Sequence, residues 1–142
     1  MILHREGGED MIKVIIDANF LFVPFQFHID IFDGIESLLG KFEPIILHTT
    51  LKELETLAGR SSAKIQRMAS AALEFVKRCK IVEVEIKHGE SGDDVILRIA
   101  KEWKCPVATN DIYLRRRLRK NGVPAIFVRQ RKHLEIEGYI PK

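Results

Sequence analysis

Four acidic residues fall at points along the chain where a predicted strand has just ended. Asp17 closes an apolar run, and Glu53 lies in the helix that follows the next apolar run. Asp93 begins a later helix, and Asp111 follows a short apolar stretch after Pro106. In an open parallel sheet these places all lie at the carboxyl edge, where ligands bind. We therefore expect the four carboxylates to lie close together.

Four carboxylates gathered at one edge repel one another, and their pKa values rise unless a cation lies among them. Hard oxygen ligands of this kind suit Mg²⁺ or Mn²⁺. Such an ion can activate water and neutralise charge that develops on a phosphate. The pattern therefore indicates metal-assisted hydrolysis of a phosphodiester.

The elements that must position these acids alternate between strand and helix. The predicted strands cover residues 11–16, 45–47, 81–86, 106–108 and 125–128. The predicted helices cover about residues 29–41, 50–58, 65–76, 91–103 and 112–121. Because parallel strands need helical crossovers, this order predicts an α/β fold with a central parallel sheet of about five strands and helices on both faces. The polar tail from Arg129 is assigned no element.

Three local signals set the expected helix boundaries. Pro44 should end the helix before it, and Gly59 should end the helix that contains Glu53. Thr50 and Glu53 have the spacing of a capping box, in which each side chain satisfies a free backbone N–H of the first turn. Glu53 therefore also has a purely structural interpretation.

Length and composition bound the class of protein. The 142 residues fit one domain. We expect residues 1–10 to be a flexible N-terminal extension and residues 11–142 to form the domain. No apolar run approaches the roughly 20 residues of a membrane helix, and the polar start is not a secretory signal, so we expect a cytoplasmic protein. Cys79 and Cys105 lack metal-ligand spacing and are interpreted as reduced core or edge thiols.

Four segments in order resemble the PIN-domain nuclease family. They are residues 14–19, 51–54, 93–100 and 107–111. The resemblance spans residues 12–128 and implies a single PIN-like domain that cuts RNA with Mg²⁺ or Mn²⁺. It is closer to archaeal relatives of ribosomal-RNA-processing PIN proteins than to VapC toxins, which would pair with an antitoxin protein.

The resemblance assigns roles to particular residues. The catalytic and metal-binding acids would be Asp17, Glu53, Asp93 and Asp111. The residues that would support them are Asn19, Thr109 and Asp94. Asp94 is an alternative to Asp93, which is favoured because it stands seven residues before Ala100, as in the family pattern. Each acid keeps a structural alternative, since Asp93 and Asp111 are also natural helix N-caps.

A basic run follows the last acid. Although the net charge is only +3, five basic residues and no acid lie between residues 112 and 120. Arginine can grip phosphate through two hydrogen bonds. We expect RNA contacts from Arg115, Arg116 and Arg119, the alternative being a solvated helix face.

Aromatic residues are dense just after Asp17, at Phe20, Phe22, Phe25 and Phe27. Packing in the core or in a homodimer is favoured over base stacking. Three further functions stay open: a structure-specific DNA nuclease, a receiver-type signalling module and a non-catalytic RNA-binding scaffold. The DNA nuclease is disfavoured because the chain lacks large insertions. The receiver is disfavoured because its phospho-acceptor Asp should end the third strand, where Ile86 and Lys87 stand.

Overall fold

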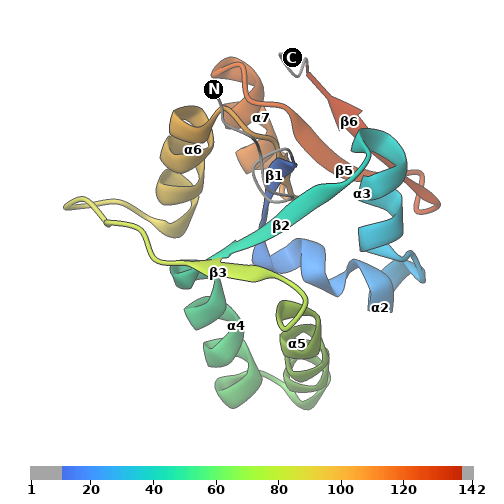
Figure 1. The fold of residues 1–142 in the computed structure, drawn as a ribbon. Coiled ribbons are helices and arrows are strands. Elements are labelled where there is room, and N and C mark those ends of the chain that lie inside the picture. The colour runs from blue at the N-terminus through green and yellow to red at the C-terminus, as the bar shows by residue number, and fades with distance from the viewer. Residues whose placement is uncertain (1–10, 139–142) are drawn as a thin grey trace.

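The computed structural model describes residues 11–138, so the prediction made for residues 1–10 lies outside the described residues. A six-stranded sheet with the order β3-β2-β1-β4-β5-β6 runs through the molecule (Figure 1). The strands are β1 (Ile12–Ile16), β2 (Phe42–Leu47), β3 (Lys80–Val82), β4 (Val107–Ala108), β5 (Ala125–Arg129) and β6 (His133–Glu137). Strands β1 to β5 pair in parallel, and β6 is antiparallel to β5. The predicted α/β class and parallel sheet are confirmed, with one strand more than expected.

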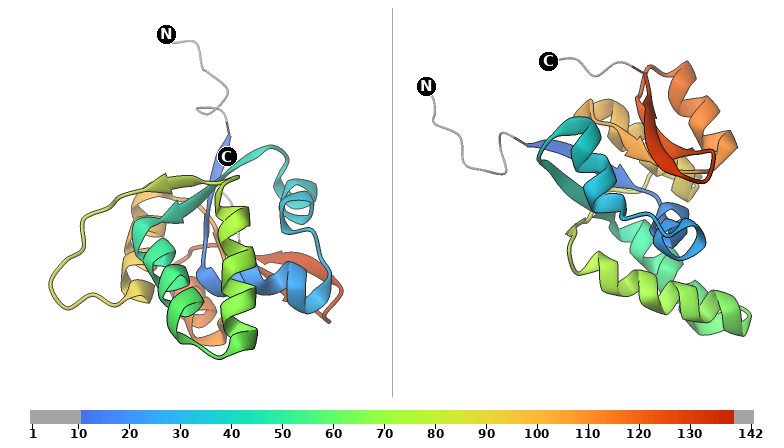
Figure 2. Two further views of the ribbon diagram at one scale, coloured as in Figure 1. Left: turned by 90° about the horizontal axis from the view of Figure 1, so that it is seen from below. Right: turned by 90° about the vertical axis from the view of Figure 1, so that its right-hand side faces the viewer.

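Helices cover both faces of this sheet. They are η1 (a 3₁₀ helix, Ala18–Phe22), α2 (Val23–Phe27), α3 (Ile31–Leu39), α4 (His48–Arg60), α5 (Ala63–Val76), α6 (Gly92–Trp103) and α7 (Ile112–Lys120). In β1, Val14 and Ile16 join the core formed with η1, α3, α4 and α5, whereas Ile15 joins the core formed with α6 and α7. Figure 2 shows α4 and α5 packed side by side, away from α6 and α7. A strand buried on both faces explains why β1 is a continuous apolar run.

The direction of the chain through the sheet changes at β1. From β1 the chain passes to β2 and β3 on one side, and later to β4 and β5 on the other. The carboxyl ends of β1 and β4 therefore flank a topological switch point, where open α/β sheets bind ligands. Asp17 directly follows β1, and Thr109 directly follows β4.

The predicted capping box at Thr50 and Glu53 is wrong. Helix α4 begins at His48, its N-cap is Leu47, and that residue makes no side-chain capping bond. Extended backbone at Leu47 leads straight from β2 into the helix, which leaves Thr50 buried inside it. Glu53 is therefore one turn into the helix and not needed as a cap.

Two predicted helix breakers lie inside regular elements. Gly59 is within α4, and Pro44 is within β2. Pro44 pairs with Val14 of β1, while β3 joins β2 only from Ile45 onward. At Pro44, β2 thus has a partner on one side alone, a position that tolerates proline's missing N–H.

The third strand is shorter than predicted. Only Lys80–Val82 pairs with β2, and the chain then leaves the sheet, with Ile86 exposed. The alternation of residues 81–86 is real, but it belongs to an edge segment whose Val84 N–H donates to Nδ1 of His48 (3.2 Å). An alternating pattern alone does not show where pairing stops.

Strand β6 lies in the tail to which the sequence assigned no element. Its Leu134 and Ile136 pack on the core shared with η1 and α3. The β5–β6 turn places Gln130 and Arg131 at φ values of 56° and 60°. Two successive positive φ values are typical of a type I′ hairpin turn, which sequences usually mark with Asn-Gly. Here neither residue gives that signal.

No helix within residues 11–138 has the length and apolar character to cross a membrane.

The β5–β6 turn generates a prediction about stability. Residues other than glycine and asparagine pay about 1 kcal/mol or more to adopt positive φ. Replacing Gln130 with Asn and Arg131 with Gly should therefore raise the free energy of unfolding by about 1 kcal/mol, measured by urea denaturation. The neighbouring change Lys132→Gly, outside the positive-φ pair, is the control and should not stabilise. A double variant no more stable than the unchanged protein would contradict this account.

Candidate active site

Asp17 is the most buried acid of the predicted set. Its exposed fraction is 6%. Its Oδ1 accepts a hydrogen bond from the Ala18 N–H (2.9 Å) and so caps η1. Its Oδ2 accepts from Oγ1 of Thr109 (2.8 Å) and from Nδ2 of Asn19 (3.2 Å). Both oxygens are thus oriented by neighbours, as a buried polar group requires.

Thr109 and Asn19 connect the ends of β1 and β4. Thr109 donates to Asp17 and accepts from the Asp111 N–H (3.1 Å). Asn19 accepts through Oδ1 from the Asn110 N–H (3.2 Å). Asn110 in turn accepts through Oδ1 from the Val128 N–H in β5 (2.9 Å). Sequence reasoning missed this role of Asn110, although its place between Thr109 and Asp111 was the available signal.

Asp111 is held at the start of α7. Its Oδ1 accepts from the N–H groups of Tyr113 (2.8 Å) and Leu114 (3.2 Å), which is an N-cap. The cap uses one carboxylate oxygen, so capping and a role in the site are compatible. The structural interpretation of Asp111 is confirmed, and its role as a site acid stays a prediction.

The four predicted acids interact through their charges. The pKa of Asp17 is raised to about 6, mainly by burial and also by the charges of Asp93 and Glu53, against the lowering effect of the Thr109 hydrogen bond. The pKa of Glu53 is raised by burial and by Asp93. The pKa of Asp93 is raised by burial and then by Asp111. Asp93 thus acts on Asp17 and on Glu53, and Asp111 acts on Asp93, so the charges of the four acids are linked.

The structure separates Asp93 from its neighbour Asp94. Ser91 caps α6 by accepting from the Asp94 N–H (3.2 Å), and Oδ2 of Asp94 accepts from the Ser91 N–H (2.9 Å). Oδ1 of Asp94 also accepts from Nη2 of Arg117 (2.8 Å). These bonds lower the pKa of Asp94, whereas that of Asp93 is raised. Asp94 is therefore occupied in holding α6 and α7, and Asp93 is the one that faces the other acids.

The donor set fits a hard divalent cation. Carboxylate oxygens are the ligands that Mg²⁺ and Mn²⁺ prefer, and a cation would relieve the repulsion that raises three of the pKa values. Within residues 11–138, no three acidic, histidine or cysteine side chains stand in an arrangement that already encloses an ion. Closing the site on a cation therefore requires side-chain rotation at the exposed acids.

The arginines of the basic helix α7 make different contacts. The guanidinium carbon of Arg115 lies 3.5 Å from the ring centroid of Phe127. Both Arg115 and Arg119 form ion pairs with Glu137 of β6. Arg117 binds Asp94. Arg116 is exposed and lies near Tyr113. Of the three arginines predicted to contact RNA, two thus also bind α7 to the end of the sheet.

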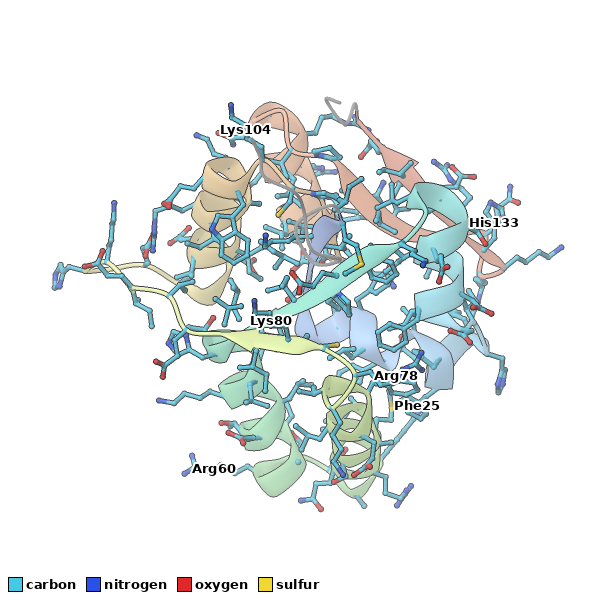
Figure 3. The ribbon with its side chains drawn as sticks, viewed as in Figure 1. Phe25, Arg60, Arg78, Lys80, Lys104 and His133 are labelled. Carbon is cyan, nitrogen blue, oxygen red and sulfur yellow. The ribbon has the colours of Figure 1, made fainter. Side chains whose placement is uncertain are left out.

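The aromatic segment after Asp17 is mainly core. Phe20 is fully buried, and Phe22 and Phe27 pack against the same core. Phe25, labelled in Figure 3, is 38% exposed. Its ring meets that of Phe75 of α5 edge to face, with ring centroids 5.7 Å apart. The core interpretation accounts for these residues.

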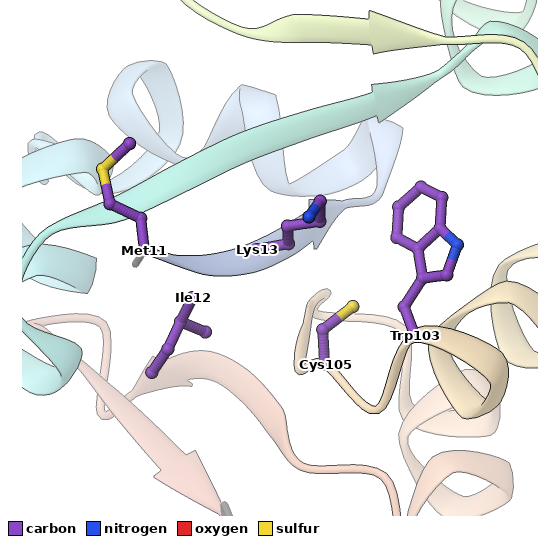
Figure 4. Close-up of a pocket in the computed structure, with 5 residues that line it drawn as sticks. All are labelled: Met11, Ile12, Lys13, Trp103 and Cys105. Carbon is purple, nitrogen blue, oxygen red and sulfur yellow. The ribbon is translucent and has the colours of Figure 1, made fainter. Parts of the chain in front are cut away.

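A pocket of about 360 Å³ lies away from the acids. It is lined by Met11, Ile12, Lys13, Trp103 and Cys105 (Figure 4). These residues surround the start of β1 and the segment before β4, which is the amino edge of the sheet. Burial raises the pKa of Cys105 to about 12, so its thiol is neutral and serves as core. The candidate active site is instead the open carboxylate edge.

Comparison with known proteins defines the class. A family model described as a PIN like domain matches residues 14–131. Because this match covers most of the chain, the protein belongs to the PIN-domain family.

Three similar proteins show which kinds of PIN-domain protein this chain resembles. The chain is 36% identical over 134 residues to Ribonuclease VapC4 of Methanocaldococcus jannaschii, covering 92% of this chain and 100% of that protein. It is 32% identical over 120 residues to the rRNA-processing protein FCF1 of Saccharomyces cerevisiae, covering 82% of this chain and 59% of the yeast protein. A solved structure of the PIN domain endonuclease Utp24 superposes with a TM-score of 0.73 at 32% identity, covering 90% of this chain and 92% of that one.

The raised pKa of Asp17 generates a prediction about pH. In the unfolded chain this carboxyl titrates near 3.8, and in the folded protein near 6. The folded state therefore holds the proton more tightly, and the stability it contributes is present below pH 4 and lost as pH rises through 6. The difference corresponds to about 3 kcal/mol at neutral pH, at about 1.4 kcal/mol for each pKa unit. The variant Asp17→Asn has no carboxyl group at this position, so it does not lose this stability as pH rises.

Melting curves in EDTA from pH 4 to pH 8 test this expectation. The melting temperature of Asp17→Asn relative to the unchanged protein should increase across this range, with most of the change between pH 4 and pH 6. Asp33→Asn, an exposed acid on α3, is the matched control and should show no such trend. A difference independent of pH would show that burial does not raise this pKa.

Proposed function

We propose that this protein is a metal-dependent endoribonuclease that hydrolyses RNA phosphodiester bonds at the carboxyl edge of its sheet. The observation that carries the proposal is the buried Asp17 at the β1–β4 switch point, whose carboxylate is oriented by Thr109 and Asn19. The charges of Glu53 and Asp93 raise its pKa, and the charge of Asp111 raises that of Asp93. Folding gains nothing from such mutual repulsion, so a ligand is the physical reason for it.

Asp17, Glu53, Asp93 and Asp111 would hold Mg²⁺ or Mn²⁺, which when bound supplies an activated water and neutralises charge on the phosphate. The chain's own contribution is position. Thr109 and Asn19 fix Asp17 before substrate arrives, so little reorganisation is needed during reaction. The overall change is hydrolysis, in which a water oxygen bonds to phosphorus, the P–O3′ bond breaks, and O3′ takes up a proton.

RNA is the proposed substrate because the relatives that match over most of this chain are a ribonuclease and an rRNA-processing protein. A role in ribosomal RNA processing is favoured by the rRNA-processing protein FCF1, which matches 82% of this chain at 32% identity. The second candidate is a VapC-type toxin with an antitoxin partner. The match to the whole length of VapC4 favours it. A homodimer and a cytoplasmic location stay predictions from the sequence.

One experiment separates these two biological roles. Expression of the unchanged protein in bacteria should leave growth intact if the substrate is a precursor ribosomal RNA, and should arrest growth if the protein is a toxin. In the arrest case, a small protein encoded beside it should restore growth and purify with it. Asp17→Asn is the control in both arms, because arrest that persists in this variant is unrelated to cleavage.

The assignment of the acids generates a prediction about activity. Asp17→Asn and Asp93→Asn should each lower the cleavage rate of single-stranded RNA in Mn²⁺ by about 100-fold or more, comparable with losing one preorganised electrostatic group. Asp94→Asn should stay within a few-fold of the unchanged protein, since its role is the α6 cap and the Arg117 ion pair. EDTA should abolish cleavage. Equal losses in Asp93→Asn and Asp94→Asn would contradict the division between them.

The contacts of the basic helix generate a prediction about RNA binding. Arg116→Ala should flatten the log–log dependence of affinity on salt by ~0.7, the value for one single-strand phosphate contact, without changing stability. Arg115→Ala should instead lower the melting temperature, because Arg115 packs on Phe127 and pairs with Glu137. Fluorescence anisotropy across a salt series, beside melting curves, measures both. An unchanged slope in Arg116→Ala would identify the exposed face as merely solvated.

A further inference from the structure

The first turn of α7 exposes apolar surface beside the acids. Tyr113 is 74% exposed and Ile112 is 54% exposed, whereas Leu114 and Leu118 carry the buried face of the helix. Tyr113 therefore contributes nothing to the core. An aromatic ring held in water at a ligand-binding edge is the kind of surface that marks an interaction site.

A backbone hydrogen bond and the spacing along α7 indicate where Tyr113 lies relative to the acids. Its N–H donates to Oδ1 of Asp111 (2.8 Å), so its backbone is fixed one hydrogen bond from a site carboxylate. It also lies four residues before Arg117, on the same side of α7. Arg117 binds Asp94 in the first turn of α6, so that side of α7 faces the start of α6. Tyr113 thus lies in the first turn of α7, two residues after Asp111, with its ring exposed to solvent.

The surroundings of the ring indicate which ligand it suits. The guanidinium carbon of Arg116 lies 5.9 Å from the Tyr113 ring centroid. An aromatic face provides a surface for a base, and a neighbouring arginine provides a contact for the adjoining phosphate. This pair stands at the edge where the acids would receive a phosphodiester. A nucleotide combines those two features in one molecule.

We propose that Tyr113 stacks on the RNA base adjacent to the scissile phosphate and that Arg116 contacts the neighbouring backbone phosphate. The inference rests on the proposed endoribonuclease function and extends it to the form of the substrate. A base inside a duplex has its faces covered by its neighbours. The cleavage site is therefore unpaired and can offer a base that splays out onto the ring. Stacking on tyrosine tolerates any base, so this contact selects an open strand and not a particular sequence.

Abasic substitution tests the contact directly. A set of single-stranded oligonucleotides, each lacking one base at successive positions around the mapped cleavage point, is cleaved by the unchanged protein and by Tyr113→Ala. Removing the stacked base should lower kcat/KM of the unchanged protein by about 5- to 150-fold, the range of base–aromatic stacking. Tyr113→Ala should show that loss on the intact strand and little further loss when the base at that one position is missing. Tyr113→Phe should retain the rate.

Controls separate stacking from other causes. Phe25→Ala removes the partly exposed aromatic on α2 and should leave the rate unchanged. In binding measurements with strands of the same length, Tyr113→Ala should weaken affinity without altering the salt slope, whereas Arg116→Ala should alter the slope. Full activity in Tyr113→Ala overturns the inference, and so does a loss that does not depend on any base position. A protein that cuts no RNA at all would refute the proposed function instead.

Discussion

The hydrogen bond from Thr109 to Asp17 holds the candidate site together, because it joins the ends of the two strands that flank the switch point. It is a buried 2.8 Å contact between residues that lie 92 positions apart in sequence. Thr109 also accepts from the Asp111 N–H, so the same hydroxyl sets the start of α7. One short side chain thus fixes the Asp17 carboxylate after β1 relative to Asp111 at the start of α7.

The arrangement that orients Asp17 for a cation also lowers the stability of the protein without one. Burying Asp17 among other acids raises its pKa and lowers the stability of the ion-free protein near neutral pH. Ion pairs around the site offset part of this loss of stability. Glu137 of β6 binds two arginines of α7, and Asp94 binds a third, so the helix that carries Asp111 is anchored on both sides. The Asp17 carboxylate and the start of α7 are therefore held in place by hydrogen bonds and ion pairs, whereas Glu53 is exposed.

Much of the architecture could be predicted from the sequence, because residues that directly follow parallel strands lie at the same, carboxyl edge of the sheet. The acids could be placed at that edge from their positions after apolar runs. Other features depended on contacts that no local pattern encodes. The false capping box arose because Thr50 and Glu53 have suitable spacing inside a helix that starts earlier, at His48. Strand β6 was missed because Gln130 and Arg131 adopt positive φ without the usual turn residues. The basic run predicted a helix after Asp111 but could not show that Glu137 meets Arg115 and Arg119.

The long sequence separation between Asp17 and Thr109 has a consequence during synthesis of the protein. A growing chain that has left the ribosome only as far as α5 carries Asp17 and Glu53 but neither Thr109 nor Asp111. Contacts of such separation form only when the intervening chain has been made and its loop-closure entropy has been offset by packing. In the proposed nuclease the four acids can therefore come together only after β4 and the start of α7 have been synthesised, so a shorter nascent chain carries an incomplete site.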